Sequence, residues 1–466
     1  MAATSQKRSG TTDLTVGKPL FQILRFALPL VLGTLFQQLY SFADTVIVGR
    51  CLGTDALGAV GTTYSLNFLI LGFVQGACVG FGIPAAETFG AKDKDGLQKY
   101  LLNGALLCLV LSVVFTVLTT LMAGPLLRLI HTPEELYADA VLYIRLIFLG
   151  IPATVLYNYA SSVLRALGDS RHPFYFLLVA SVVNILLDYL FIVPLGMGVD
   201  GAAVATVLSQ LCSCLFVLHF LFGPAPQVGI SFGGYRPWLM GRILLTGLTP
   251  FLIIAVDNLM IIVLNALLQR YGGESQGDLL VAAATISQSF MLVVTMPLGG
   301  MTGGTASILG YNLGAGQPKR ILEAQKYILI IAVAYTGVLC LVGQLFAAPF
   351  TRIFTPDVQV SALAVTAIRI TSMGIVPLGV QYVIVDGLTG MGMMRYSLPL
   401  SAFRKLVYFV AIFILPAAFG AMAIFFAEPI SDLIPPVVTV LFYWRKIPWL
   451  KRQALLHGQP EKTTQA

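Results

Sequence analysis

Long apolar stretches separated by short polar connections run through this chain from one end to the other. A helix needs about 20 apolar residues to cross the hydrocarbon core of a bilayer, which is roughly 30 Å thick. The pattern therefore predicts twelve membrane-spanning helices. Their expected ranges are 20–49, 57–83, 97–122, 137–162, 174–194 and 199–222 in the first half, and 241–268, 279–305, 322–348, 360–386, 397–422 and 428–445 in the second.

The polar connections divide the chain into five parts. The polar start over 1–19 has no apolar core followed by a cleavage site, so we interpret it as a cytoplasmic tail and not as a signal peptide. Two lobes of six helices follow, over 20–222 and 241–445, and a cytoplasmic linker rich in Gly and Pro joins them over 223–240. Residues 446–466 are expected to form a second cytoplasmic tail.

Small, charged and proline residues recur in the two halves at a nearly constant spacing. Matching spans have the same orientation, so the repeat is parallel, with its axis along the membrane normal. We therefore expect two pseudo-symmetric six-helix lobes around a central cavity, an arrangement typical of alternating access. The matched pairs are Gly76 and Gly300, Gly80 and Gly304, Gly90 and Gly314, Ala91 and Ala315, Gly168 and Gly392, and Arg171 and Arg395 at 224 residues, Pro194 and Pro416, and Ser209 and Ser431 at 222, and Pro29 and Pro250 at 221.

Composition and charge agree with an all-α polytopic membrane protein. Only 11% of the residues are charged, against roughly a quarter in soluble domains. With a cytoplasmic N-terminus, the Lys and Arg residues of the inner connections outnumber those outside (Arg50, Arg128, Arg270 and Arg352) by about five to one. This asymmetry favours an even number of spans in the inner (plasma) membrane, with both termini cytoplasmic and the lipid bilayer as a partner.

The net charge of +7 does not indicate nucleic-acid binding. The positive residues stand at the ends of apolar runs, where they set the orientation in the membrane. Of the six cysteines only Cys212 and Cys214 are close together, on different faces of a helix, so neither a metal site nor a disulfide framework is predicted. With four histidines and no nucleophile motif, a membrane-embedded enzyme is also disfavoured.

Two acidic residues fall inside apolar spans of the first half, where a central charge costs roughly 2.5–3.5 kcal/mol on insertion scales. Asp44 lies in span 1 and Asp188 in span 5, with Asn184 one turn before Asp188 on the same face. Asn158 in span 4 and Thr206 in span 6 add polar groups at a similar depth. Gathered in a poorly solvated pocket, the two carboxyl groups favour holding a proton, and with Asn184 their oxygens also suit Na⁺. Interhelical hydrogen bonding without an ion is the alternative.

Four further residues are candidates for the wall of a substrate cavity. Gln37 and Tyr40 precede Asp44 in span 1, whereas Asp257 and Asp386 lie in spans 7 and 10, where they would contact a cationic substrate or a second ion. The 29 Phe, 18 Tyr and 13 Met residues suit flat organic cations through dispersion and cation–π contacts.

Proline and basic residues within the spans raise separate questions. Pro29 removes a backbone hydrogen bond in span 1 and can bend that helix near Asp44, either as part of a conformational change or as a static kink. Five basic residues lie near span ends or deeper, and those near an end are expected to reach toward the lipid head groups: Arg25, Arg145, Arg369, Arg404 and Lys405.

Several strings along the chain are characteristic when they are taken together. They are LPLVLGTLFQQLYSFADTVIVGR in span 1, FGAKDKDGLQKYL after span 2, YNYASSVLRALGDSRHP from span 4 onward, VVNILLDYLFIVPLGMGVDGAAVATVLSQ in spans 5 and 6, and PLGGMTGGTASILGYNLGAGQPKRILEA in the second half. Over residues 15–450 the chain resembles the multidrug and toxic compound extrusion (MATE) family.

The resemblance implies twelve helices in two lobes, a proton or sodium gradient as the energy source, and export of mostly cationic amphiphiles. In one branch of the family the coupling site lies in the N-terminal lobe and combines a carboxylate, two Asn, an Asp and a Thr. The bending proline of that branch falls on Pro29. The resemblance assigns the coupling roles to Asp44, Asn158, Asn184, Asp188 and Thr206.

The second half departs from another branch of the family, which has an acidic pair in spans 7 and 10. Asp257 matches the first member of that pair only approximately, and Asp386 lies too near the end of span 10 to match the second. The resemblance therefore assigns no coupling site in the C-terminal lobe.

We therefore expect a monomeric secondary exporter that antiports small organic molecules against H⁺ or Na⁺ and uses no other cofactor. The alternative is a flippase for lipid-linked saccharides or cell-wall precursors from the wider superfamily, which would favour a cationic cavity for pyrophosphate. A major-facilitator sugar porter also has parallel halves. It would carry a Gly-Asp-Arg loop between spans 2 and 3, where this chain has GAKDKDG.

Overall fold

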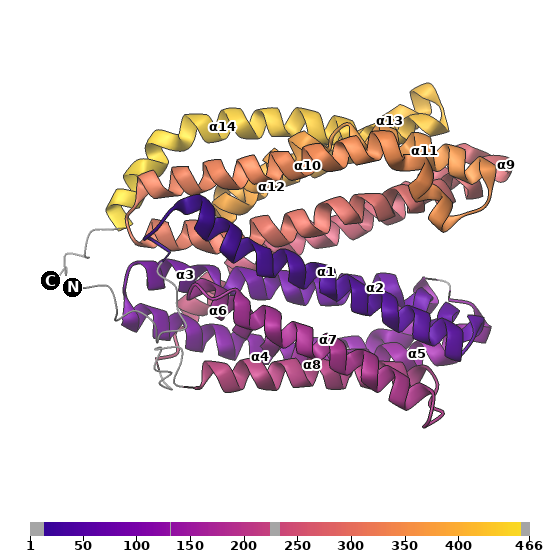
Figure 1. Cartoon of the computed structure of the whole chain (residues 1–466), viewed down its shortest axis with the longest axis horizontal. Helices are drawn as coiled ribbons and strands as arrows, with labels where there is room; N and C mark the ends of the chain where they lie inside the picture. The colour runs from indigo at the N-terminus through magenta and orange to yellow at the C-terminus, as the bar shows by residue number, and fades with distance from the viewer. Residues whose placement is uncertain (1–13, 131, 224–233, 458–466) are drawn as a thin grey trace. The chain divides into compact units, whose positions relative to one another are not determined.

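The computed structural model describes residues 14–130, 132–223 and 234–457, and these residues are almost entirely helical, with no strand among them (Figure 1). The two predicted tails and the predicted linker fall partly outside the described residues.

Fourteen α-helices and one 3-10 helix, η1, make up the described fold. The first half contains α1 (Pro19–Cys51), α2 (Thr54–Phe81), α3 (Ile83–Gly90), α4 (Lys94–Leu129), α5 (Glu134–Leu149), α6 (Ile151–Ala166), α7 (Arg171–Ile192) and α8 (Val199–Leu221). The second half contains α9 (Pro237–Gly314), α10 (Pro318–Phe354), α11 (Val358–Ser372), α12 (Ile375–Gly390), α13 (Met394–Phe419), η1 (Ala421–Phe426) and α14 (Ala427–His457).

Nine to eleven membrane crossings can be identified among the described helices. Among the described residues, nine helices are long and apolar enough to cross a membrane, and two bent pairs, α5 with α6 and α11 with α12, make one crossing each. The first part of α9 contains a shorter apolar helix, Leu259–Gly273, and the backbone leaves helical geometry at Gly273 (φ 63°, ψ −169°). The prediction of an all-α protein with many membrane spans is confirmed. α14 continues to His457, so the first part of the tail predicted over 446–466 is helical.

The internal repeat extends to the backbone conformation. The bend of 42° between α5 and α6 falls at Gly150, and the bend of 49° between α11 and α12 falls at Gly374, which is 224 residues later. Positive φ angles, which are uncommon outside glycine, recur at the same spacing. The pairs are Lys92 (59°) and Gly316 (67°), Gly168 (88°) and Gly392 (69°), and Gly196 (65°) and Gly420 (85°).

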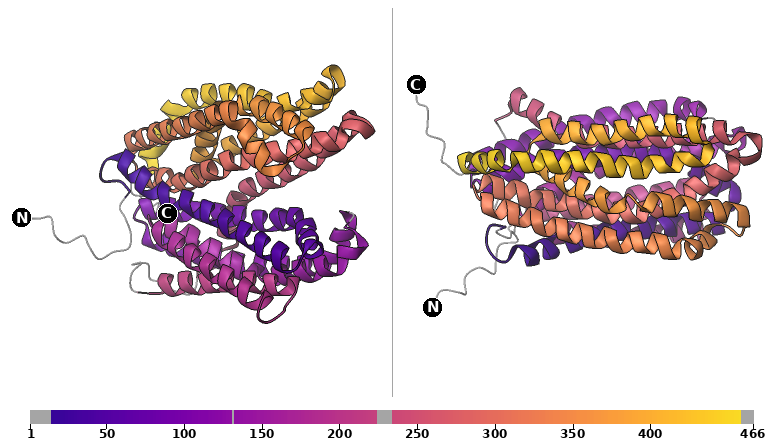
Figure 2. Two further views of the ribbon diagram at one scale, coloured as in Figure 1. Left: turned by 45° about the vertical axis from the view of Figure 1, so that its right-hand side comes forward. Right: turned by 90° about the horizontal axis from the view of Figure 1, so that it is seen from above.

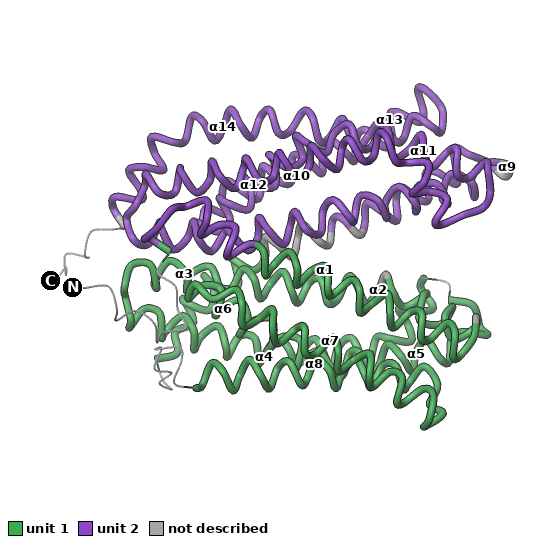
Figure 3. The backbone as a smooth tube through the Cα atoms, in the orientation of Figure 1, with its two compact units in different colours: residues 1–14, 28–254 green, residues 15–27, 255–466 purple. Residues whose placement is uncertain are grey.

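Contacts within the chain group the described residues into two units. Unit 1 contains Leu14 and the described residues of 28–254, and unit 2 contains 15–27 and 255–457 (Figure 3). Both α1 and α9 are therefore divided. The first turns of α1 belong to unit 2, and the first turns of α9 belong to unit 1.

Specific contacts account for these two divisions. In unit 2, Arg320 of α10 donates hydrogen bonds from Nη2 to Gly17 O (2.8 Å) and to Gln22 Oε1 (2.7 Å), which fixes the start of α1. In unit 1, α2 and the start of α9 approach so closely that a Cβ atom at Gly80 would lie 2.5 Å from the Gly247 Cα. Because only glycine lacks a Cβ, this close approach requires glycine at position 80.

A polar contact adds to this packing in unit 1. Arg242 of α9 donates a hydrogen bond from Nη1 to the Tyr100 hydroxyl of α4 (2.9 Å), and its Nη2 lies 3.6 Å from Glu87 Oε2 of α3. The first turns of α9 are thus held against α3 and α4 by charge as well as by shape.

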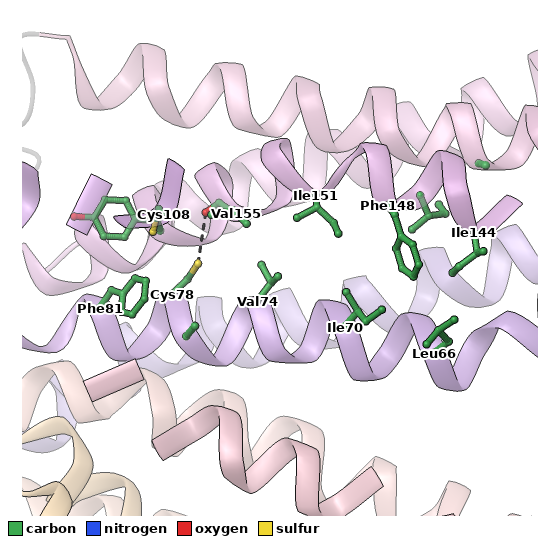
Figure 4. Packing of buried hydrophobic residues seen from close by; sticks show 14 of the residues in the cluster. Leu66, Ile70, Val74, Cys78, Phe81, Cys108, Ile144, Phe148, Ile151 and Val155 are labelled. Carbon is green, nitrogen blue, oxygen red and sulfur yellow. Dashed lines mark hydrogen bonds between the residues drawn. The ribbon is translucent and has the colours of Figure 1, made fainter. Parts of the chain in front are cut away.

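The helices of each unit lie side by side as a bundle (Figure 2). In unit 1, Ile144 and Phe148 of α5 and Ile151 of α6 are completely buried, and they face Ile70 and Val74 of α2 (Figure 4). Because lipid tails are as apolar as these side chains, close packing and not the exclusion of water holds such helices together.

Candidate functional site

Asp44, Asn184 and Asp188 lie in the interior of unit 1. Asp44 is on α1, and the other two are one turn apart on α7, so that their side chains share a face. Their exposed fractions are 9%, 1% and 0%, respectively. Asn184 Nδ2 donates a hydrogen bond of 3.4 Å to Thr206 Oγ1 of α8. We call these four residues the acid-pair site.

The oxygens of the acid-pair site are acceptors with few donors. The Asp44 and Asp188 carboxyl groups are close enough to interact electrostatically, and two ionised carboxylates can only accept hydrogen bonds. Oδ1 of Asp44, Oδ1 of Asn184 and both carboxylate oxygens of Asp188 are buried and receive no hydrogen bond from a described N–H or O–H group. Buried polar atoms without a partner are rare and costly. The site therefore suits a proton or a small cation, which would supply the missing positive charge.

Asn158, the fifth predicted coupling residue, is not hydrogen-bonded to this site. Its Nδ2 donates to Thr154 O within α6 (2.8 Å). Thr154 Oγ1 in turn donates to Gln210 Oε1 of α8 (2.6 Å). Asn158 is thus connected to α8, the helix that carries Thr206, by way of Thr154.

Two tyrosines stand beside the acids. Tyr40 of α1 lies within electrostatic reach of Asp44, and Gln37, the other predicted cavity residue of this helix, lies one turn before Tyr40. Tyr143 of α5 is 5% exposed and lies near both Asp44 and Asp188. Sequence patterns do not single out Tyr143, because a tyrosine within an apolar span gives no distinct signal.

Pro29 lies inside α1, next to the point between Ala27 and Leu28 where this helix passes from unit 2 to unit 1. A proline has no N–H group, so the helix lacks one backbone hydrogen bond there. The helix that carries Asp44 is therefore weakened close to the division between the units.

The two acidic candidates of the second half have separate partners in unit 2. Asp257 of α9 forms an ion pair with Lys405 of α13. Asp386 of α12 accepts a hydrogen bond of 2.5 Å from Thr302 Oγ1 of α9. Lys405 does not extend toward the lipid head groups, because the residue is only 9% exposed and its ammonium group binds Asp257.

A comparison with protein families decides which kind of protein has this arrangement. The family model described as MatE matches residues 29–190 and 253–415, which includes Asp44, Asn184 and Asp188. The chain belongs to the MATE family. The resemblance seen in the sequence is thereby confirmed, and the chain is a multi-pass membrane protein of a family of transporters.

Individual relatives agree with the MATE assignment. The probable multidrug resistance protein YpnP of Bacillus subtilis is 32% identical over 311 residues, which cover 66% of this chain and 68% of that protein. The FAD transporter of Shewanella oneidensis is 24% identical over 92% of this chain and 94% of its own. The structure of a MOP superfamily transporter from Pyrococcus furiosus has a TM-score of 0.88 at 27% identity, and covers 96% of this chain and 100% of that one.

Two acidic residues in span 12 of this MATE chain are not singled out by the sequence patterns. Glu428 and Asp432 stand one turn apart on α14, and Asp432 is completely buried. Arg404 of α13 binds Asp432 Oδ1 through both Nε and Nη2, each at 2.8 Å, so Arg404 does not extend toward the head groups either. Two features of the sequence could have indicated this ion pair. Glu428 and Asp432 are four residues apart in span 12, and two consecutive basic residues lie in span 11.

Proposed function

We propose that this MATE transporter exports organic molecules by antiport against protons or Na⁺, with the acid-pair site as the coupling site. The observation that carries this proposal is a pair of buried carboxyl groups, Asp44 and Asp188, that interact electrostatically. Among the described residues, no Lys or Arg forms an ion pair with either group, and three of their four oxygens receive no hydrogen bond. An acid pair of this kind is expensive within a membrane unless a cation neutralises it.

The residues of the site suggest how an ion acts. A proton bridges the two carboxyl groups, whereas Na⁺ takes oxygen ligands from Asp44, Asp188 and Asn184, as hard cations prefer. Thr206 holds Asn184 in position through its hydroxyl group. Binding from the outside draws α1 toward α7 and α8, the substrate leaves outward, and release of the ion inside resets the transporter. Each ligand shifts the two states only by the difference in its affinity for them.

The names of two relatives bear on the class of substrate. One relative is named as a probable multidrug resistance protein, and another as a transporter of FAD, which is an anion. Our proposal is that organic cations are carried, with Gln37 and Tyr40 in contact with the substrate near the coupling site. We also propose a monomer in the plasma membrane with both termini in the cytoplasm, as the distribution of Lys and Arg favours.

The experiment is dye efflux from loaded cells or everted vesicles that hold the full-length chain, under an imposed pH or Na⁺ gradient. The variants are Asp44→Asn and Asp188→Asn, and the matched control is Asp95→Asn, whose side chain is exposed at the start of α4. Ethidium is the cationic probe. We expect gradient-driven efflux in the wild type and the control, and its loss in both site variants. The gradient that drives efflux identifies the ion.

Normal pumping by both site variants would refute the role of the acid pair. If the wild type moves no ethidium, FAD is tested in the same vesicles, because of the named relative. If neither probe responds to either gradient, the antiport proposal is wrong and a flippase for lipid-linked saccharides becomes the better hypothesis.

A further inference from the structure

Unit 2 contains a second group of intramembrane charges, which the proposed coupling mechanism does not use. Three helices supply it, with Asp257 on α9, Arg404 and Lys405 on α13, and Glu428 and Asp432 on α14. The group therefore holds three acids and two bases. We call it the charge cluster.

Each base of the charge cluster has one acid as its direct partner. Arg404 binds Asp432, and Lys405 binds Asp257. Glu428 has no ion-pair partner within 4.0 Å among the described residues, but it lies within electrostatic reach of both bases and of Asp432. Lys405, which is in direct contact with Asp257, is thus also within electrostatic reach of Glu428 and Asp432. Tyr382 of α12 and Tyr408 of α13 also face these acids.

The internal repeat relates the charge cluster to the acid-pair site. Ser209 and Ser431 are matched positions 222 residues apart, and the same spacing places Glu428 opposite Thr206 and Asp432 opposite Gln210. Thr206 is part of the acid-pair site in unit 1. The two units therefore carry polar side chains at corresponding positions of their last helices, α8 and α14.

The two sites differ in how their acids are neutralised. In unit 1, no described Lys or Arg forms an ion pair with Asp44 or Asp188, so a cation must come from solution. In unit 2, Lys405 brings a cation that is covalently part of the chain. A lysine ammonium is a compact charge on a flexible stem, which resembles a small monovalent cation more closely than a guanidinium does.

We propose that Lys405 is a tethered cation that occupies a latent site for a small monovalent cation, H⁺ or Na⁺, formed by Asp257 and Glu428. Arg404 keeps Asp432 permanently neutralised beside this site. Unit 2 consequently exchanges no ion with solution, and ion exchange is confined to unit 1. The alternative is an ion pair that only joins α9 to α13, and that no free cation can replace.

The experiment measures thermal unfolding of the purified full-length chain in detergent, so that no transport is required. All variants carry Asp44→Asn and Asp188→Asn, which remove the acid-pair site. Lys405→Met removes the tethered charge at a similar side-chain length, and Lys405→Arg is the matched control that keeps it. A third variant combines Lys405→Met with Asp257→Asn and Glu428→Gln. Each is titrated with NaCl against choline chloride at constant ionic strength, and with pH.

For Lys405→Met we expect a Tm that rises by several degrees with Na⁺ or on acidification, since a ligand that binds only the folded state stabilises it. The response to Na⁺ at constant pH separates Na⁺ from H⁺. The parent, Lys405→Arg and the triple replacement are expected to show no such rise. A folded Lys405→Met variant without any cation response would overturn the proposal. A Lys405→Met variant that stays unfolded at every Na⁺ concentration and pH would overturn it as well, whatever the triple replacement does. Because the readout is stability, failure here leaves the coupling role of Asp44 and Asp188 untouched.

Discussion

Arg404 binds Asp432 through a single oxygen. Its Nε and Nη2 both lie 2.8 Å from Oδ1, while Oδ2 is buried without a partner among the described residues. The Asp432 side chain packs against Gly374, where a Cβ atom would come within 2.7 Å of the Asp432 Cβ. The ion pair therefore braces α13 and α14 against the bend between α11 and α12.

Removing one partner of this pair is expected to be costly. Arg404→Met leaves the Asp432 carboxylate buried without its base, which destabilises a protein by about 3–5 kcal/mol. The double variant Arg404→Met with Asp432→Leu removes both charges and should recover most of that loss. Thermal unfolding in detergent measures both effects.

A half-exposed ion pair provides the control for this prediction. The Arg242 side chain is 47% exposed and lies 3.6 Å from Glu87, whose side chain is 13% exposed, so solvent screens this pair more than the Arg404–Asp432 pair. Arg242→Met should therefore change stability far less than Arg404→Met. Equal losses in the two variants would mean that burial of Asp432 is not what makes the Arg404 pair important.

Gly80→Ala should destabilise unit 1. The new methyl group would lie 2.5 Å from the Gly247 Cα and 2.6 Å from Thr246 O, so that α2 and α9 must move apart. Overpacking of this kind costs about 1–3 kcal/mol. In the same helix, Gly61 has no atom within 4 Å of its Cβ position, and Gly61→Ala should be neutral or stabilising by up to about 1 kcal/mol. A Tm for Gly80→Ala equal to that of Gly61→Ala would argue against the close approach.

Asn184→Ala should weaken ion binding more than stability. It removes the oxygen proposed as an ion ligand and the hydrogen bond to Thr206, and interhelical hydrogen bonds in membranes average only about 0.6 kcal/mol. We expect a higher Na⁺ or H⁺ concentration for half-maximal efflux, with Tm almost unchanged. Ser209→Ala is the matched control, because Ser209 Oγ donates to Thr206 O within its own helix. The prediction fails if both variants need the same ion concentration as the wild type.

Pro29→Ala should slow efflux without harming the fold. Alanine restores the missing backbone donor in α1 and stiffens this helix near the division between the units. We expect Tm to be unchanged or higher and the efflux rate to fall. Pro125→Ala replaces another proline inside a helix, in α4, and should pump normally. Wild-type efflux in Pro29→Ala would show that the proline is a static feature.

The sequence predicts the crossings well because each is a long apolar run, and a single acid in such a run is conspicuous. This is why Asp44 and Asp188 stand out from the hydropathy pattern alone. The bends at Gly150 and Gly374 could not be predicted in the same way, because the apolar pattern continues across them without interruption.

The partners of the charged residues lie beyond local sequence patterns. Lys405 and Asp257 are 148 residues apart, and nothing near either residue indicates that they meet. Hydropathy places Lys405 within the predicted span 397–422 but does not indicate which face of the helix it lies on, and the packing of α13 buries it. Glu428 escapes notice for a related reason, since the predicted span 12 begins at this residue and puts it at the membrane edge.

The reciprocal membership of α1 and α9 has a consequence for how this chain can be divided. Each half of the chain begins with a segment that groups with the other half: 15–27 with unit 2, and the first turns of α9 with unit 1. This is an intramolecular form of segment swapping. A cut in the connection between the halves would give two fragments. The first would carry 15–27 of unit 2 and lack the start of α9, and the second would carry the start of α9 and lack 15–27. We expect each fragment to fold stably only when the other fragment is produced in the same cell. If the repeat arose by duplication, the ancestral half-length chain would have exchanged the same segment between two copies, as a swapped dimer.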